Sequence, residues 1–308
     1  MSEATLNETE PGKSTLENRI YRAVVKRTER LTEGMMRIVL GGPDLETFLS
    51  TGIGDEYIRL FLPERGESIP VYPHPEGEYW EYDADQVAGP MRTYTIRAVD
   101  PQAGEISVDF VVHPGGIAAD WALGALPGSQ VGFNTPNGLY ALPVEATWQI
   151  LLADATGLPA AARLLENAPA GLRTTAILEV SGPDHEQDLQ LGADTQVRWM
   201  HGGNGNSPSR LAEVLRGLEL PEGPGYIWVA GEARVTREAR KHLRKELKLP
   251  VTHFKVVGYW TDKAEEWNER YEALGEDFKK WLEELWSTDT DPEIIQDEVA
   301  DVFDANGL

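Results

Sequence analysis

The chain lacks cysteine altogether, although it is 308 residues long. This absence excludes disulfide bonds, thiolate catalysis, zinc sites built on cysteine and iron–sulfur clusters held by cysteine. Histidine is also scarce, because the six histidines are scattered and none forms a His-x-x-x-His pair at helical spacing. A protein-bound metal is therefore not expected.

Long apolar runs are missing as well. No run reaches the roughly 20 residues that span a bilayer. Residues 1–16 are polar and acidic, and they lack the apolar segment of a secretory signal. From these two observations we expect a cytoplasmic protein without a membrane span.

Basic residues are few in comparison with acidic ones. The chain has 28 Lys and Arg against 51 Asp and Glu, which gives a net charge of −23. A surface of this sign repels a phosphate backbone, so nucleic acid is not expected as a partner. The acidity favours a basic partner or a cationic ligand, or serves only to keep the surface solvated.

The length and the order of the patterns predict two folded domains between two tails. Residues 1–17, rich in Glu, Thr and Ser, are predicted to be a disordered tail. Residues 18–145 hold short strand-like runs separated by Gly and Pro turns, which indicate a small antiparallel β-barrel. Residues 146–260 alternate strands with helices, which predicts an α/β domain with a parallel sheet. Residues 261–308 are predicted to form an acidic helical extension.

The extension carries about half of the net charge. From Tyr259 to Leu308 there are 16 acidic and 4 basic residues, a net charge of −12. Its apolar residues recur at helical spacing, which predicts a stripe that packs against the body of the protein or a second subunit. The stripe consists of Trp267, Tyr271, Leu274, Phe278, Trp281 and Leu285.

Several local predictions concern the ends of elements. Residues 63–90 are rich in Pro, Gly and Glu without clear periodicity and are predicted to be a long loop. Helices are predicted over 207–216, with the serine at 207 as the N-cap, and over 235–247. Residues 231–233 are predicted to be the turn that follows the buried strand 226–230.

An Arg-x-Tyr-Thr motif occupies residues 92–95 on a strand-like pattern. Arg92 offers a guanidinium that can fork onto phosphate oxygens, and Tyr94 offers a flat ring for stacking. Thr93 and Thr95 offer hydroxyls that can bond a ring nitrogen. This combination suits a flavin nucleotide, which is flat at one end and anionic at the other. A polar edge strand with no ligand is the simpler alternative.

A glycine-rich turn follows one hairpin later and leads into an Ala-rich helix. It runs His113, Pro114, Gly115, Gly116, Ile117, Ala118, Ala119, Asp120, Trp121 and Ala122. Unpaired backbone N–H groups at the start of a helix form a ready anion site. The alternative is an ordinary turn before a surface helix.

Polar residues follow the first buried strand of the α/β half. The apolar run from Trp148 ends in Asp154, and Thr156 and Gly157 come directly after it. Ligands of parallel sheets bind at the carboxyl ends of the strands, where Glu232 is also expected. No Gly-x-Gly-x-x-Gly follows this strand, so a nicotinamide nucleotide is indicated by the strand–helix alternation alone.

Four motifs occur in a fixed order: the Arg92 strand, the His113 turn, Asp154 to Ala160, and Ala230 through Trp260. Together they resemble the siderophore-interacting protein family of flavin-dependent ferric-siderophore reductases, over about residues 18–262. The resemblance implies the ferredoxin-reductase architecture, with an FAD-binding barrel followed by an NAD(P)H-binding α/β domain. It also implies that electrons pass from NAD(P)H, or from a ferredoxin, through FAD to a ferric siderophore.

The resemblance also implies roles for individual residues. Arg92 would bind the FAD phosphate, Tyr94 would pack on the isoalloxazine and Thr95 would bond its edge. Backbone N–H groups from Gly116 to Ala119 would hold the pyrophosphate. The nicotinamide site would be lined by Asp154, Thr156 and Glu232. The full predicted cofactor set is Arg92, Thr93, Tyr94, Thr95, His113, Gly115, Gly116, Ile117, Ala118, Ala119, Trp121, Asp154, Thr156 and Glu232. No catalytic acid, base, nucleophile or metal ligand is predicted.

The sequence departs from the family pattern at three positions. Ala119 stands where the family often has serine, and Ala155 replaces a common acidic residue, which puts NAD(P)H binding in question. Thr261 replaces a common arginine, and Lys255 and Lys263 are predicted to supply positive charge toward a siderophore instead. Two other functions stay open: a general NAD(P)H:flavin or ferric reductase, and a non-catalytic flavin- or siderophore-binding protein.

Overall fold

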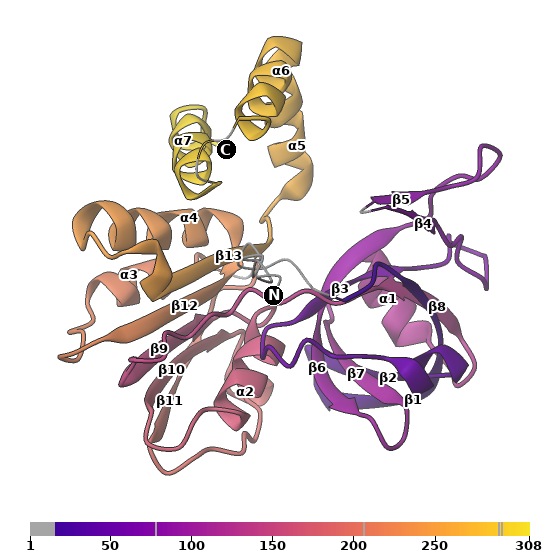
Figure 1. Ribbon diagram of the computed structural model, residues 1–308, viewed down its shortest axis with the longest axis horizontal. Helices are drawn as coiled ribbons and strands as arrows, with labels where there is room; N and C mark the ends of the chain where they lie inside the picture. Colours follow the sequence, from indigo (N-terminus) through magenta and orange to yellow (C-terminus); the bar gives the residue numbers. More distant parts are fainter. Residues whose placement is uncertain (1–15, 78, 206, 289, 291) are drawn as a thin grey trace, which may run out of the picture.

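Figure 1 shows the protein as a computed structural model, which describes residues 16–77, 79–205, 207–288, 290 and 292–308. An antiparallel barrel and a parallel-sheet domain stand side by side, and the C-terminal helices lie above them in this view. The fold class predicted from the sequence is thereby confirmed. The predicted disordered tail over 1–17 lies outside the described residues except for its last two positions.

The barrel is closed by six strands in the order β1-β2-β7-β6-β3-β8. Its strands are β1 (Ile20–Thr32), β2 (Met35–Gly41), β3 (Tyr57–Phe61), β6 (Met91–Asp100), β7 (Glu105–Val111) and β8 (Gln130–Asn134). Alternate side chains fill its interior, as small barrels require, among them the fully buried Ile38, Ile96 and Phe110. Helix α1 (Ile117–Gly124) packs against this core through Ala118 and Ala122.

The second domain contains a five-stranded parallel sheet in the order β11-β10-β9-β12-β13. Its strands are β9 (Trp148–Ala153), β10 (Arg173–Val180), β11 (Thr195–His201), β12 (Gly225–Glu232) and β13 (Phe254–Trp260). Helix α2 (Leu158–Glu166) covers one face, while α3 (Leu211–Arg216) and α4 (Ala233–Lys241) cover the other. Every residue of β9 is buried, as expected for a strand covered on both faces.

Polar contacts, some buried and some partly exposed, join the two domains. Asp55 precedes β3, and its Oδ2 accepts a hydrogen bond of 3.0 Å from the indole of Trp228 on β12. Burial raises the pKa of Asp55, although three donors hold its carboxylate. On the neighbouring strand, Arg97 bonds Glu166 of α2 at 2.7 Å. These contacts fix the outer face of β6 against the α/β domain.

The C-terminal extension is helical, as predicted, and folds on itself. Its helices are α5 (Ala264–Ala273), α6 (Gly275–Trp286) and α7 (Pro292–Ala305). Trp267, Tyr271 and Phe278 from the predicted stripe surround Phe303 of α7, with ring centroids 5.8 to 6.3 Å away. These members of the stripe therefore pack within the extension, whereas the sequence predicted packing against the body or a second subunit.

Three local predictions were wrong. The loop over 63–90 contains a short hairpin, β4 (His74–Glu76) and β5 (Tyr79–Glu81), which is too short to show a period. Helix α3 begins at Leu211, because the Ser207 hydroxyl accepts a hydrogen bond from Gly203 and closes the preceding loop. Residues 231 and 232 continue β12, because pairing with β13 extends beyond the apolar run.

The helix predicted over 235–247 is divided in two. Helix α4 is followed by one π-helical turn, His242–Glu246. Within the part of the chain that the structure describes, no helix is both long enough and apolar enough to cross a membrane.

Candidate functional site

Strand β6 turns the residues of the Arg-x-Tyr-Thr motif in different directions. Arg92 is exposed, and its guanidinium bonds only the carbonyl of Met91 among the described residues, without a carboxylate partner. Tyr94 packs its ring on Phe110 of the barrel core, 4.2 Å between centroids. Thr95 is 5% exposed and points the other way, toward the α/β domain. The motif therefore reaches the boundary between the domains.

The hydroxyl of Thr95 is a buried polar group without a hydrogen-bond partner in the described part of the chain. The Tyr259 hydroxyl comes close enough for Thr95 to lower its pKa, while burial raises that pKa overall, but the pair does not reach hydrogen-bond geometry. Buried hydroxyls nearly always find a partner. This one is free to bond a ligand at the domain boundary.

The turn before α1 forms an open backbone cradle. Gly116 is the N-cap of α1, and no side chain caps the helix. Gly115 has φ +77°, and a Cβ added there would meet nothing within 4 Å. The ring of His113 lies so close to Gly116 that an added Cβ would come within 2.5 Å of it. The N–H groups of the first turn are therefore available to an anion.

The other members of the predicted set in this turn support the cradle. Ala118 and Ala119 are buried, Ala118 within the barrel core, whereas Ile117 is exposed. Trp121 lies against Phe110, 5.7 Å between centroids, and so shares a ring neighbour with Tyr94. The turn and the motif thus meet over one part of the barrel core.

Asp154, just beyond the end of β9, is buried and accepts four hydrogen bonds. Its Oδ1 accepts from the Thr156 N–H and hydroxyl, at 2.8 and 2.6 Å, and from the Gly157 N–H at 3.3 Å. Its Oδ2 accepts from the indole Nε1 of Trp260 at 2.6 Å. Burial nevertheless raises its pKa, because desolvation outweighs these donors.

Glu232, the last residue of β12, also accepts hydrogen bonds from neighbouring backbone N–H groups. One carboxylate oxygen caps α4 by accepting from the Val235 N–H at 2.9 Å, and the other accepts from the Asp262 N–H at 3.4 Å. Asp154 and Glu232 therefore both hold the chain at the carboxyl edge of the parallel sheet. Roles for Asp154, Thr156 and Glu232 in contacting a nicotinamide stay predictions.

A third polar residue at this edge was missed from the sequence. Asn204 adopts φ +52°, and its Oδ1 accepts from the Ala155 N–H at 3.0 Å. It sits in a run of glycines at 202, 203 and 205, all with positive φ. That run after a strand was the available signal, because left-handed conformations favour Gly and Asn.

The two predicted siderophore lysines lie at different places along β13. Lys255 stands near the start of the strand, opposite Trp228, and its charge lowers the pKa of Asp55. Lys263 follows the strand, is 67% exposed at its side chain and lies 3.9 Å from Glu266. The structure does not bring them together, and their role in substrate binding stays a prediction. The described residues contain no group of three or more metal-ligating side chains.

Comparison with known proteins gives this arrangement its context. A family model described as siderophore-interacting FAD-binding domain matches residues 24–140, and one described as siderophore-interacting protein matches residues 146–263. The chain belongs to the siderophore-interacting protein family. The resemblance inferred from four motifs is thereby confirmed.

Relatives within the family match most of the chain. The ferric vibriobactin reductase ViuB of Vibrio cholerae is 30% identical over 266 residues, 82% of this chain and 94% of that protein. The NADPH-dependent ferric-chelate reductase of Escherichia coli is 29% identical over 246 residues, 79% of this chain and 93% of that protein. A siderophore utilization protein from T. fusca has a solved structure that covers 80% of this chain and 94% of its own, with 33% identity and a TM-score of 0.72.

The residues of this siderophore-interacting protein fit FAD. The cofactor needs donors for its pyrophosphate, and the first turn of α1 and Arg92 offer them without competing partners in the described structure. It also needs a polar partner at the edge of its ring, and the Thr95 hydroxyl, which has no partner among the described residues, would supply one. Both features lie on the barrel, within the part that the FAD-binding family model covers.

Proposed function

We propose that this protein uses FAD to reduce ferric siderophores, with electrons taken from NAD(P)H. The observation that carries the proposal is the buried Thr95 hydroxyl, which has no hydrogen-bond partner in the described structure and lies where β6 meets the end of β13. At that point β6, which also carries Arg92, lies beside Tyr259 near the end of β13. A ligand bridging the two domains would place its ring edge there.

The relatives support the ferric substrate. Two of them, each matched over more than nine-tenths of its own length, bear the names of ferric reductases, one for vibriobactin and one for ferric chelates. Bound FAD can take up two electrons from a nicotinamide and release them one at a time, which a one-electron acceptor such as Fe(III) requires. Fe(II) binds oxygen-rich chelators weakly, so reduction releases the metal.

The chain's own residues hold the cofactor in position and do not react themselves. Arg92 and the first turn of α1 bind phosphates, Tyr94 and Trp121 shape an aromatic wall with Phe110, and Thr95 orients the ring edge. Asp154 already accepts four hydrogen bonds, so its carboxylate is occupied in holding the edge of the sheet. Electron transfer needs neither a general acid nor a base, which agrees with this geometry.

The electron donor is the finer part of the proposal. Gly157 lies so close to β12 that a Cβ there would be 3.0 Å from the Ala230 carbonyl. At this edge of the sheet the Ala155 N–H donates to Asn204, and the Thr156 N–H and hydroxyl donate to Asp154. Such an ordered edge suits a nicotinamide nucleotide. The E. coli relative bears the name of an NADPH-dependent enzyme, which supports the same donor.

The test is an anaerobic titration of the FAD-loaded protein. NADH and NADPH are added separately while the flavin absorbance is followed, and a ferric siderophore is then added with an Fe(II) indicator. We expect bleaching by one nicotinamide, followed by return of the absorbance and formation of Fe(II). Bleaching that no ferric siderophore reverses would contradict the proposal.

The same titration separates the alternatives. Equal rates with simple ferric chelates and ferric siderophores would favour a general ferric reductase. If neither nicotinamide bleaches the flavin but a reduced ferredoxin does, the electron donor is a ferredoxin and the proposed substrate stays the same. Flavin that no donor reduces would favour a binding protein without activity.

A further inference from the structure

Helix α5 begins directly beside the proposed site. Strand β13 ends at Trp260, whose indole is bound to Asp154, and α5 starts at Ala264. The connection is tied down by the hydrogen bond from the Asp262 N–H to Glu232. The first turn of α5 is therefore held at the same edge of the sheet as the candidate nicotinamide residues.

This edge carries a surplus of negative charge. Lys263 and Arg270 both pair with one carboxylate, that of Glu266, at 3.9 and 3.5 Å. Asp262, Glu265 and Glu269 are exposed and have no ion-pair partner within the described structure. The two cations within and just before α5 are thus already partly neutralised, and three carboxylates are not.

A second acidic element stands on the barrel side of the site. Trp80 of β5 packs edge-on against Phe61 of β3, 5.5 Å between centroids, with the guanidinium of Arg59 5.3 Å from its ring. Strand β3 pairs with β6, so the hairpin is anchored beside the strand of Arg92. The hairpin and the residues just after it carry the exposed carboxylates of Glu76, Glu81, Asp83 and Asp85.

The two acidic elements project from the same side of the molecule. In Figure 1 the β4–β5 hairpin rises above the barrel and α5 rises from the boundary between the domains, both in the upper half of the view. A chelate that approaches the domain boundary from this side passes the negative charges of both elements, which together are called the acidic rim below. Charges act over about 10 Å at 0.1 M salt, so the effect does not require direct contact.

We infer that the protein discriminates among ferric siderophores by their charge, favouring neutral and cationic complexes over anionic ones. This inference rests on the proposed function. Iron(III) held by three hydroxamates is neutral, and a free amine on the chelator makes the complex cationic. Iron(III) held by three catecholates carries three negative charges. The acidic rim therefore selects the hydroxamate class, because a charged entrance raises or lowers the local concentration of a charged substrate.

The experiment uses one iron site with three charges. The probes are the ferric complexes of a linear trihydroxamate with a terminal amine, of its N-acetyl derivative and of its N-succinyl derivative, which are cationic, neutral and anionic. Their iron coordination is the same, so the driving force is matched. The FAD-loaded protein is reduced anaerobically, mixed with each complex, and the return of flavin absorbance is timed at low and high salt.

We expect the second-order rate constant at low salt to fall from the cationic to the neutral to the anionic complex, by about threefold or more at each step. The three constants should converge at 1 M salt, where charges are screened within about 3 Å. Equal constants at low salt, or a faster anionic complex, would overturn the inference and leave ferric reduction standing. Failure of all three complexes to reoxidise the flavin would instead overturn the proposed function.

Matched variants locate the effect. The double variant E265Q/E269Q removes two carboxylates from α5, and E219Q/E222Q removes two exposed carboxylates from the loop before β12, at the opposite edge of the sheet. We expect E265Q/E269Q to raise the rate of the anionic complex about twofold or more at low salt, with E219Q/E222Q unchanged. The same gain in both pairs would show that net charge, not the rim, decides.

Discussion

The indole of Trp260 donates a 2.6 Å hydrogen bond to the carboxylate of Asp154, which is 106 residues earlier in the chain. This bond ties the end of the edge strand β13 to the end of the central strand β9. Gly231 lies between them on β12, and a Cβ there would be 2.7 Å from Asp154 Oδ2. The carboxyl edge of the sheet is therefore built around one buried carboxylate.

The first prediction removes the indole donor. In Trp260→Phe, Asp154 Oδ2 loses its only hydrogen bond recorded among the described residues and remains buried. We expect the free energy of unfolding to fall by about 1–3 kcal/mol, the usual cost of an unsatisfied buried polar group. Urea unfolding measures it. Trp286→Phe is the control, since Trp286 is 49% exposed, and an equal loss in both variants would contradict the argument.

The second prediction concerns pH. Burial raises the pKa of Asp154 above its ordinary value of about 3.9, so the folded protein holds this proton more tightly than the unfolded chain. The resulting stabilisation is fully present below the unfolded pKa and is lost as the pH rises through the raised folded pKa. Asp154→Asn cannot titrate. The free energy of unfolding of the wild type, minus that of the variant, should therefore decrease from about pH 4 upward.

Taking the difference removes most of the other acidic groups from the comparison, because both proteins share them. Urea unfolding at a series of pH values measures it. A difference that is constant, or that grows with pH, would show that the donors around Asp154 outweigh its burial.

The third prediction tests the phosphate site. Arg92 is exposed and without a carboxylate partner in the described chain, so Arg92→Ala should leave folding unchanged while weakening FAD binding about tenfold or more, as expected for a lost charge-assisted bond to phosphate. Fluorescence titration of apoprotein with FAD measures the affinity. Arg173→Ala is the control, because Arg173 is exposed at the opposite edge of the sheet. Full affinity in the Arg92 variant would remove this residue from the site.

Where the sequence succeeded, the signal was local. The apolar run from Trp148 predicted a buried parallel strand, because a strand covered on both faces has no polar side. The Arg-x-Tyr-Thr motif and the glycine turn likewise mark the barrel features that the structure brings over the Phe110 ring.

Where the sequence failed, the deciding contact was one that the sequence pattern did not indicate. Ser207 does not cap a helix because Gly203 already uses its hydroxyl, and β12 continues to Glu232 because β13 pairs with it. The bond between Trp260 and Asp154 spans 106 residues and leaves no local pattern. The strands of the hairpin, β4 and β5, have three residues each, so alternation does not mark them.

The fourth prediction uses the free hydroxyl of Thr95. Because this hydroxyl is buried without a partner in the described structure, Thr95→Val should leave the stability of the apoprotein unchanged or raise it slightly. The same variant should bind FAD more weakly, by about fivefold or more, and shift the flavin absorbance. Thermal unfolding of the apoprotein and FAD titration measure the two effects. A variant that is less stable yet binds FAD normally would show that the hydroxyl serves the fold.

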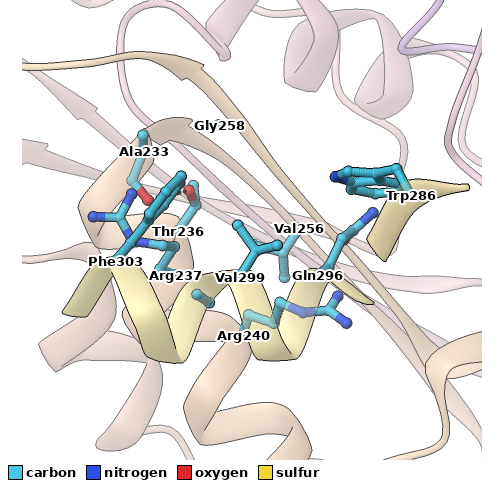
Figure 2. Close-up of a pocket in the computed structure, with 11 residues that line it drawn as sticks. Ala233, Thr236, Arg237, Arg240, Val256, Gly258, Trp286, Gln296, Val299 and Phe303 are labelled. Atoms are coloured by element: carbon cyan, nitrogen blue, oxygen red, sulfur yellow. Dashed lines mark hydrogen bonds between the residues drawn. The ribbon is translucent and has the colours of Figure 1, made fainter. Parts of the chain in front are cut away.

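The last prediction concerns how α7 is held. Its carboxylates meet a basic row on α4 and the following π-turn: Arg240 bonds Asp297 at 2.8 Å, and Lys245 bonds Asp301 at 2.6 Å. Asp304 lies 3.6 Å from Lys241. Few apolar side chains of the described part of α7 are buried, Ile295 being 1% exposed. The pairs of Lys241 and Lys245 are exposed, so each contributes about 0.2–1 kcal/mol and is screened by salt. Arg240, beside α7 in Figure 2, is buried, so its pair with Asp297 is screened less.

We therefore expect D297N/D301N/D304N to loosen α7, so that limited proteolysis within the extension becomes several times faster at low salt. At 1 M salt the difference in rate should shrink without vanishing, because salt screens the exposed pairs but only weakly the buried Arg240–Asp297 pair. The control E269Q/E283Q/E298Q removes the same charge from exposed residues that have no ion pair in the described structure, and should behave as wild type. Proteolysis that is insensitive to both salt and the triple variant would mean that the ring cluster around Phe303, not the ion pairs, holds the helix.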